Sequence, residues 1–321
     1  MNKKIGIISL IVIIGVLATY LVLRDHGKNE REGQLTIPHE LGEAVLDPNP
    51  ERVIVFDFGI ADALHHLGIE IMGLPKASLP TYLDDIYGSN KYSNVGSLKE
   101  PDFEQIAKLK PDLIIISSRQ RDLYENFDKI APTLYMALDT SDYLGSFEKN
   151  LNILGEIFEK EDEVKALLDE VKQAVDSLQQ ALYEVKENLD RVPNALILMV
   201  NGDKISAYGE GSRFGIIHKE FGFEAIAKDL KDSTHGANIS FERVLELNPD
   251  YLFVIDRGLA IGENTNKTTR EIIENEIIKE TNAYKNGNII YLDSEVWYLS
   301  TGGIYSTKKM IEEVKQALIA K

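Results

Sequence analysis

The chain contains no cysteine among its 321 residues. Disulfide bonds and thiolate metal sites are therefore excluded, as is a lipid anchor attached to a cysteine. Basic residues are also scarce, because 35 Lys and Arg stand against 52 Asp and Glu, and the formal net charge is −17. Such a chain lacks the basic face that phosphate backbones require, so we expect no nucleic-acid partner.

The motifs of common enzyme classes are missing as well. There is no Gly-x-Ser-x-Gly nucleophile elbow, no Walker A loop and no zinc-binding His-x-x-x-His pair with a general-base glutamate. The glycine-rich stretch Gly209–Gly215 matches neither dinucleotide nor phosphate-loop spacing, and is typical of a turn between a strand and a helix. These absences favour a binding protein over an enzyme.

Charge is absent from one long run near the N-terminus. Ile5–Leu23 holds 19 uncharged residues and follows Lys3 and Lys4. A run of that length can span a bilayer as a helix, and the flanking lysines favour leaving the rest of the chain outside. A cleaved signal peptide is the alternative, although its apolar part is usually shorter and ends in a small-x-small site. We expect residues 1–32 to be a membrane anchor and tether, with the protein on the outer face of the cell membrane.

An 18-residue pattern occurs twice, 138 positions apart. Phe103–Gln120 reads FEQIAKLKPDLIIISSRQ and Phe241–Gly258 reads FERVLELNPDYLFVIDRG. Each copy runs from an amphipathic segment through Pro-Asp into an apolar stretch that ends at an arginine, Arg119 or Arg257. Ligands of open α/β sheets bind outside the carboxyl ends of the strands. We therefore expect both arginines to face one cleft.

Strand-like and helical segments alternate on both sides of one long helical stretch. Apolar runs predict buried strands at Arg52–Asp57, Asp112–Ser118, Thr133–Met136, Ala195–Asn201, Tyr251–Asp256 and Asn288–Asp293. No glycine or proline interrupts Lys160–Arg191, in which apolar residues recur every three or four positions. We expect an α/β fold with one lobe at 33–159, a backbone helix at 160–190 and a second lobe at 191–321. A single helical joint predicts little movement between the lobes.

Three loop segments carry further candidate residues. Arg213 lies in the Gly209–Gly215 turn, which makes it a third candidate for a cleft-facing arginine. His235 lies in a polar segment before the second repeat, and Trp297 and Tyr298 follow the last expected strand. For His235 and the aromatic pair, the residues alone support a binding role and an ordinary structural role about equally.

Several long motifs resemble one protein family. In order along the chain they include NPERVIVFDFGIADALHHLGI, NVGSLKEPDFEQIAKLKPDLIIISSRQ, YGEGSRFG, DSTHGANISFERVLELNPDYLFVIDR and YLDSEVWYL. The chain resembles the class III substrate-binding proteins of ABC importers, and among them the ferric catecholate siderophore binders of the petrobactin and enterochelin type. The resemblance runs from Ile37 to the C-terminus and implies two α/β lobes joined by one long helix.

The resemblance also implies a ligand site. Its residues, with the aromatic pair included, are Lys99, Arg119, Arg213, Arg257, Trp297 and Tyr298. A ferric complex of three catecholates carries three negative charges, which must be balanced by cations when the complex is buried. Arginine fits this role, because its planar guanidinium donates to paired oxygens and stacks on aromatic rings.

Iron enters as part of the cargo, and no intrinsic cofactor is expected. In some relatives, a histidine and a tyrosine complete the coordination of iron when the siderophore leaves two positions open. The residues at these positions are His235 and Tyr298. Phenolate is a hard oxygen donor and imidazole a common iron ligand, so this pair could complete an octahedron.

The expected partners are a ferric siderophore and the permease of an ABC importer with its ATPase. Family members present one carboxylate on each lobe to the permease, and the corresponding residues here are Asp62 and Glu220. We expect a monomer, held at the membrane by its N-terminal helix. Two alternatives stay open: the same fold carrying haem, a cobalamin or a hydroxamate siderophore, or an anchored surface enzyme.

Overall fold

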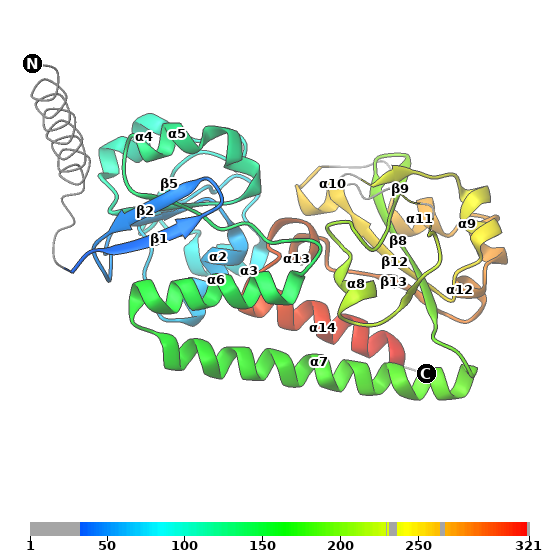
Figure 1. Cartoon of the computed structure of the whole chain (residues 1–321). Helices are drawn as coiled ribbons and strands as arrows, with labels where there is room; N and C mark the ends of the chain where they lie inside the picture. Colours follow the sequence, from blue (N-terminus) through cyan, green and yellow to red (C-terminus); the bar gives the residue numbers. More distant parts are fainter. Residues whose placement is uncertain (1–32, 229, 231–235, 264–266, 320–321) are drawn as a thin grey trace, which may run out of the picture.

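The computed structural model describes residues 33–228, 230, 236–263 and 267–319. They form two α/β lobes that lie side by side above a layer of long helices (Figure 1). An antiparallel hairpin of β1 (Leu35–His39) and β2 (Gly42–Leu46) precedes the first lobe. The predicted α/β class is confirmed.

The first lobe contains a parallel sheet in the order β5-β4-β3-β6-β7. Its strands are β3 (Val53–Val55), β4 (Gly73–Leu74), β5 (Ser93–Asn94), β6 (Leu113–Ile116) and β7 (Thr133–Tyr135). Its helices are α2 (Phe58–His66), α3 (Thr81–Tyr87), α4 (Phe103–Leu109), α5 (Tyr124–Asp128) and the 3-10 helix η1 (Ser118–Leu123). The predicted strands of this lobe are present, each slightly shorter than its apolar run.

The second lobe contains a mixed sheet in the order β11-β9-β8-β12-β13, with β10 also paired to β8. Its strands are β8 (Asn194–Asn201), β9 (Lys204–Tyr208), β10 (Glu224–Ala225), β11 (Ala237–Asn238), β12 (Tyr251–Asp256) and β13 (Ile289–Tyr291). Strand β9 runs antiparallel to both of its neighbours. Shorter helices surround the sheet: α8 (Ile216–Lys219), α9 (Phe241–Leu247), α10 (Arg257–Ala260), α11 (Thr269–Ile273), η2 (Ile278–Glu280), α12 (Asn282–Lys285) and α13 (Ser294–Leu299).

The two copies of the sequence repeat fold alike. Helices α4 and α9 each span seven residues and end at a left-handed residue, Lys110 or Asn248, both with φ 51°. The chain then turns through Pro-Asp into β6 or β12. The aspartates of these turns make equivalent ion pairs with an arginine that precedes the neighbouring strand: Asp112 with Arg52, and Asp250 with Arg191. Because the two units fold alike, Arg119 and Arg257 both follow the carboxyl end of their strands, β6 and β12.

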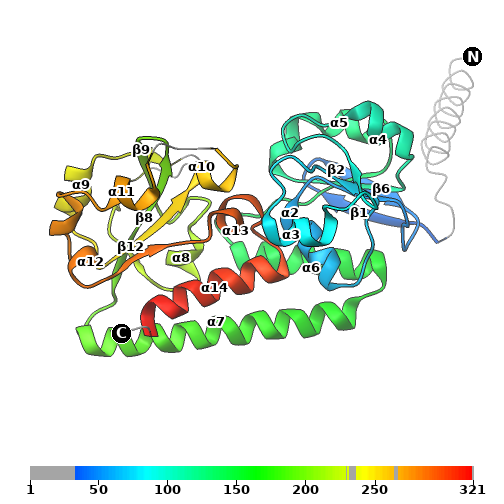
Figure 2. The ribbon, with the colours of Figure 1, turned by 180° about the vertical axis from the view of Figure 1, so that it is seen from behind.

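Three long helices form the layer beneath the lobes: α6 (Tyr143–Phe158), α7 (Glu161–Leu189) and α14 (Ile304–Ile319). Helix α7 is the predicted backbone helix, and its buried side chains include Val164, Val171 and Leu178 from the predicted stripe. Helix α14 lies along α7 and also contacts α2 of the first lobe, as seen from behind in Figure 2. Helix α14 therefore contacts both lobes, whereas the prediction assigned all of residues 191–321 to the second lobe.

One hydrophobic core runs through both lobes and the long helices. Alternate residues of each central strand point into it, as Val53 and Val55 do from β3 and Ile197 from β8. The residues between them, such as Ile54 and Leu198, pack into separate clusters on the outer faces of the two sheets. The shared core ties both sheets to one layer of helices.

The predicted membrane anchor at 1–32 lies outside the described residues. Within the part of the chain that the structure describes, no helix combines the length and the apolar character that crossing a bilayer requires.

Candidate ligand-binding site

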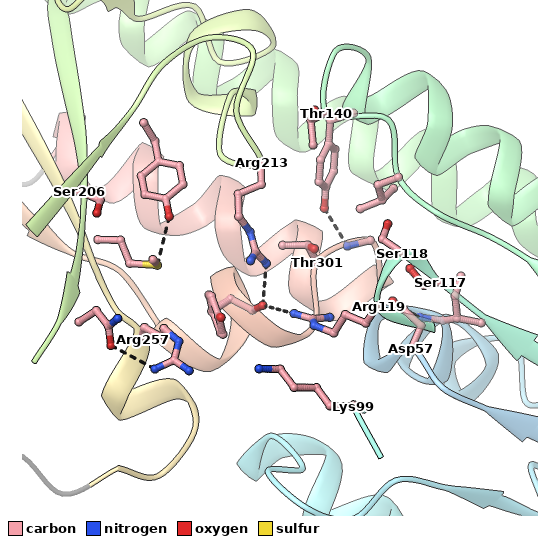
Figure 3. A pocket seen from close by; sticks show the side chains of 18 of the residues that line it. Asp57, Lys99, Ser117, Ser118, Arg119, Thr140, Ser206, Arg213, Arg257 and Thr301 are labelled. Atoms are coloured by element: carbon pink, nitrogen blue, oxygen red, sulfur yellow. Dashed lines mark hydrogen bonds between the residues drawn. The ribbon is translucent and has the colours of Figure 1, made fainter. Parts of the chain in front are cut away.

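A cavity of about 590 Å³ lies between the two lobes (Figure 3). The first lobe contributes Lys99, Ser117, Ser118 and Arg119, and the second contributes residues of β8, β9 and β11 together with Arg213 and Arg257. Both repeat arginines line this one space. The structure thus brings the predicted Lys99, Arg119, Arg213, Arg257 and Tyr298 together around one cavity.

Tyr298 lies where two of the arginines meet. Its backbone carbonyl accepts a hydrogen bond from Nη2 of Arg119 at 2.9 Å and another from Nη2 of Arg213 at 2.8 Å. Its ring lies 4.6 Å from Cζ of Arg213 and 6.0 Å from Cζ of Arg119. One residue of α13 therefore holds arginines from both lobes at the same place.

The closeness of these guanidinium groups makes this wall strongly positive. Burial and the neighbouring Arg119 lower the pKa of Arg213 to about 10, while Tyr298 opposes the change. Arg213 therefore stays protonated near neutral pH, at an energetic cost that a bound anion would relieve. Such a pair of partly desolvated cations favours an anionic ligand.

Arg257 forms a second anchor on the same wall. It follows β12 directly, and its Nη1 donates to Oδ1 of Asn201 at 3.1 Å and lies 3.5 Å from Oε1 of Glu263. Burial lowers the pKa of Arg257, but the Tyr298 side chain and Glu263 outweigh this effect and raise it above its usual value. Its side chain is 23% exposed, so the guanidinium stays reachable from the cavity.

Two lysines complete the cationic lining. Lys99 is exposed in the loop between β5 and α4, and Lys204 is exposed at the start of β9. Lys204 was not among the predicted site residues. The alternation of side chains in Lys204–Tyr208 could have indicated it, because in a strand Lys204, Ser206 and Tyr208 lie on one face.

Asp57 is the one carboxylate on the described lining. Its side chain caps α2 by accepting the backbone N–H of Ile60 at 3.0 Å. Burial raises the pKa of Asp57, while the Ile60 N–H and nearby Arg119 lower it in part. Asp57 thus has a structural role in the first lobe, and the cavity remains predominantly positive.

A model of the periplasmic binding protein family matches residues 53–296, which include the sheets of both lobes and most of the residues that line the cavity. The chain belongs to the periplasmic binding protein family.

Several relatives resemble the chain over most of its length. The petrobactin-binding protein YclQ of Bacillus subtilis is 46% identical over 296 residues, which cover 91% of this chain and 90% of YclQ. The crystal structure of YclQ matches 90% of this chain and 99% of its own with a TM-score of 0.85. The periplasmic catecholate-siderophore binding protein VctP of Vibrio cholerae is 36% identical, covers 88% of this chain and 99% of its own, and has a TM-score of 0.81.

A third relative carries a different cargo name. The ferric-anguibactin-binding protein FatB of Vibrio anguillarum is 31% identical over 301 residues, which cover 88% of this chain and 87% of FatB. All three are binding proteins. Because the family and its near relatives bind solutes rather than transform them, the surface-enzyme alternative is set aside.

The prediction that Trp297 lines the cleft is wrong. Its side chain is fully buried, and its Nε1 donates to Oε2 of Glu313 at 2.9 Å. Trp297 and Tyr298 are neighbours on the helix α13, so their side chains point in different directions. Only Tyr298 faces the cavity; Trp297 joins the core beside α14.

The prediction that Asp62 offers a surface carboxylate to a permease is also wrong. Asp62 is 1% exposed, and it accepts hydrogen bonds from the backbone N–H groups of Tyr305 and Ser306 at 3.3 and 3.0 Å. It also pairs with His66, 2.9 Å away. Asp62 therefore stabilises the first turn of α14 against the first lobe.

Glu220 does not match its predicted docking role either. It is half-buried at the end of α8, where Oε1 accepts the backbone N–H of Tyr143 at 3.0 Å at the start of α6. Burial raises the pKa of Glu220, partly offset by N–H groups of Tyr143 and Leu144. Glu220 thus connects the second lobe to a helix end and is not freely presented to a partner.

The predicted iron ligand His235 lies outside the described residues. In the part of the chain that is described, no three His, Asp or Glu side chains are grouped so that they could hold a metal ion. Tyr298 alone of the predicted pair can be placed, and it lines the cavity. The direct contact of His235 and Tyr298 with iron stays a prediction.

Proposed function

We propose that the chain is the extracytoplasmic binding component of an iron-siderophore ABC importer, and that it holds a ferric catecholate siderophore in the cavity between its lobes. The observation that carries this proposal is the meeting of Arg119 and Arg213 at the carbonyl of Tyr298, with Arg257 beside them. Three guanidinium groups at one wall of a cavity are a site for a ligand with several negative charges.

The charge of the cargo suits this wall. A ferric triscatecholate is a trianion, and its charge lies on oxygens close to the metal and next to flat aromatic rings. Guanidinium groups donate to paired oxygens and stack on rings, so they recognise both features at once. A neutral hydroxamate complex would leave the mutual repulsion of the arginines uncompensated, which disfavours it as cargo.

The names of the relatives support the same class of cargo. YclQ is a petrobactin-binding protein, VctP a catecholate-siderophore binding protein and FatB a ferric-anguibactin-binding protein. These names agree on siderophores and differ in the individual compound. We therefore propose the class and leave the individual siderophore to a ligand panel.

Iron would be held mainly by the siderophore. Where a siderophore supplies fewer than six donor oxygens, Tyr298 and His235 are our candidates for the remaining positions. The support for this step is that Tyr298 lines the cavity between the arginines.

The proposed mechanism is electrostatic capture followed by limited closure of the lobes, with no covalent chemistry. The loaded protein would then pass its cargo to a membrane permease driven by an ATPase. In this proposal it acts as a monomer tethered at the outer face of the membrane. Relatives named as periplasmic support an extracytoplasmic place.

A ligand panel tests this function. The purified full chain is titrated by calorimetry with ferric enterobactin, ferric petrobactin, a ferric hydroxamate, haem and cobalamin. We expect tight one-to-one binding of at least one catecholate complex and much weaker binding of the hydroxamate. Preference for haem, cobalamin or the hydroxamate over both catecholates would replace the proposed cargo by that ligand.

A further inference from the structure

The second lobe presents a set of polar side chains to the cavity that the three arginines do not account for. Asn201 ends β8, Lys204 and Ser206 lie on β9, and Asn238 lies on β11. All four line the cavity. We call these four residues the polar shelf.

The sheet fixes the arrangement of the shelf. Asn201 lies opposite Lys204 in the β8–β9 pairing, and Ser206 lies opposite Asn238 in the β9–β11 pairing. The shelf therefore consists of two neighbouring cross-strand pairs. Cross-strand partners have closely spaced side chains on the same face of a sheet, so the four residues act as one surface.

The face of β9 that carries the shelf is determined by its core residues. Ile205 and Ala207 alternate with Lys204 and Ser206, and both pack into the hydrophobic cluster on the outer side of the sheet. A shift of β9 by one residue would expose this apolar pair and bury Lys204. The pairing of β9 therefore fixes the side of the sheet on which Lys204 lies, and this side faces the cavity.

The chemistry of the shelf is that of an oxygen-anion site. Lys204 supplies an ammonium group, Ser206 a hydroxyl, and Asn201 and Asn238 amide groups. Oδ1 of Asn201 accepts a hydrogen bond from Arg257, which places a guanidinium at the edge of the shelf. Figure 3 shows Ser206 and Arg257 on one side of the cavity and Ser117 and Ser118 on the other.

The lining of the first lobe differs from the shelf. Besides Lys99 and Arg119, it includes the apolar side chains of Ile60, Met136 and Leu138 together with small hydroxyl groups. The two sides of the cavity therefore offer different surroundings to the periphery of a ligand.

We propose that the polar shelf is a specificity site for a carboxylate that the ligand carries outside its iron-binding oxygens. This inference rests on the proposed function, in which the arginines take the ferric centre. The described lining holds two lysines besides the three arginines, so Lys204 adds a positive charge beside the place proposed for the ferric centre. Lys204, the cross-strand partner of Asn201, is the residue that recognises the additional acid.

Two simple ferric complexes test the shelf. Ferric tris(4-methylcatecholate) and ferric tris(3,4-dihydroxyphenylacetate) have the same iron-binding oxygens, but only the second carries carboxylates away from the metal. Dissociation constants of both are measured for the full wild-type chain and for Lys204→Gln, Lys204→Arg and Lys228→Gln. Lys228 is an exposed residue of the same lobe that pairs with Glu224, so its variant controls for the loss of one positive charge.

We expect the wild type to prefer the carboxylate complex and Lys204→Gln to reduce the ratio of the two affinities by about tenfold. Lys204→Arg should retain the preference, and Lys228→Gln should leave both constants unchanged. No preference in the wild type, or an unchanged ratio in Lys204→Gln, would overturn the proposal while leaving the proposed function intact. Failure of the wild type to bind either complex would count against the ferric catecholate function itself, and the shelf proposal would fall with it.

Discussion

At the scale of single residues, Tyr298 explains how three arginines share one wall. Its backbone carbonyl accepts from two of them, and its side chain interacts with the third. The arginines could be predicted from the sequence, because the repeat places two of them at strand ends and the third lies in a glycine-rich turn. It could not mark this use of Tyr298, because every residue has a backbone carbonyl and its direction depends on the fold.

Replacing the Tyr298 hydroxyl distinguishes the positioning of the arginines from the proposed coordination of iron. Tyr298→Phe keeps the carbonyl that holds Arg119 and Arg213, and Arg257 keeps Asn201 and Glu263 as partners. A six-donor ferric catecholate should therefore bind nearly as in the wild type. A four-donor complex, which leaves two positions of iron open, should bind about tenfold more weakly if the phenolate coordinates iron. Visible absorption of the bound complex should change in the second case alone. Equal affinities and identical spectra for wild type and variant would exclude Tyr298 as an iron ligand.

Asp62 gives a second test at this scale. The variant Asp62→Asn loses the negative charge of the carboxylate that accepts hydrogen bonds from the Tyr305 and Ser306 N–H groups. We therefore expect the free energy of unfolding to fall by about 1–3 kcal/mol. Denaturant unfolding measures this change. Asp85→Asn, on the exposed side of α3, is the matched control and should change stability by less than about 0.5 kcal/mol. Unchanged stability in Asp62→Asn would contradict the structural role assigned to this carboxylate.

At the scale of elements, the sequence predicted most of what periodicity controls. The strands, the long helix α7 and the matching α4–β6 and α9–β12 units follow from apolar spacing and from Pro-Asp turns. The six predicted strands are those with continuous apolar runs, and the seven described strands without such a run, β9 and β11 among them, were not predicted. Lys204 was missed for that reason. Asp62 and Glu220 were assigned to docking by resemblance, and the sequence could not show that the packing of other helices buries one and half-buries the other.

The contact between α8 and α6 predicts a pH effect. Burial raises the pKa of Glu220 above its ordinary 4.5, so the folded chain binds this proton more tightly than the unfolded chain does. From pH 4.5 upward, Glu220 therefore lowers stability progressively, until the folded state has lost the proton as well. Glu220→Gln removes this titration, so its stability relative to the wild type should increase as the pH rises through that window. Unfolding free energies of both proteins across the window measure the difference, and a constant difference would contradict the prediction.

At the scale of the whole molecule, the two lobes do not depend on α7 alone for their relative position. Helix α14 contacts α7 and α2, and one hydrophobic core continues from the first sheet to the second. The sequence predicted a single helical joint. It could not predict the second one, because the amphipathic pattern of α14 does not reveal which surfaces it contacts.

This double joint predicts a small closing movement. The chain has no cysteine, so spin labels can be attached selectively to the variant that carries both Asp85→Cys and Lys228→Cys, one exposed position in each lobe. Binding of a ferric catecholate should change the distance between the labels by no more than a few ångströms. A change comparable with a helix diameter, about 10 Å, would show that the lobes move as independent bodies.

The central claim is that the arginines of the cavity hold an anionic ferric catecholate. Calorimetric titration of ferric enterobactin into wild type, Arg257→Gln and Arg243→Gln tests it most directly. Arg243, on α9 of the same lobe, pairs with Glu246 and is absent from the described lining, so it is the matched control. We predict tight one-to-one binding by the wild type and Arg243→Gln, and binding at least about tenfold weaker in Arg257→Gln, a loss of about 1.4 kcal/mol or more. Equal affinity in all three proteins, or no binding by the wild type, would contradict the claim.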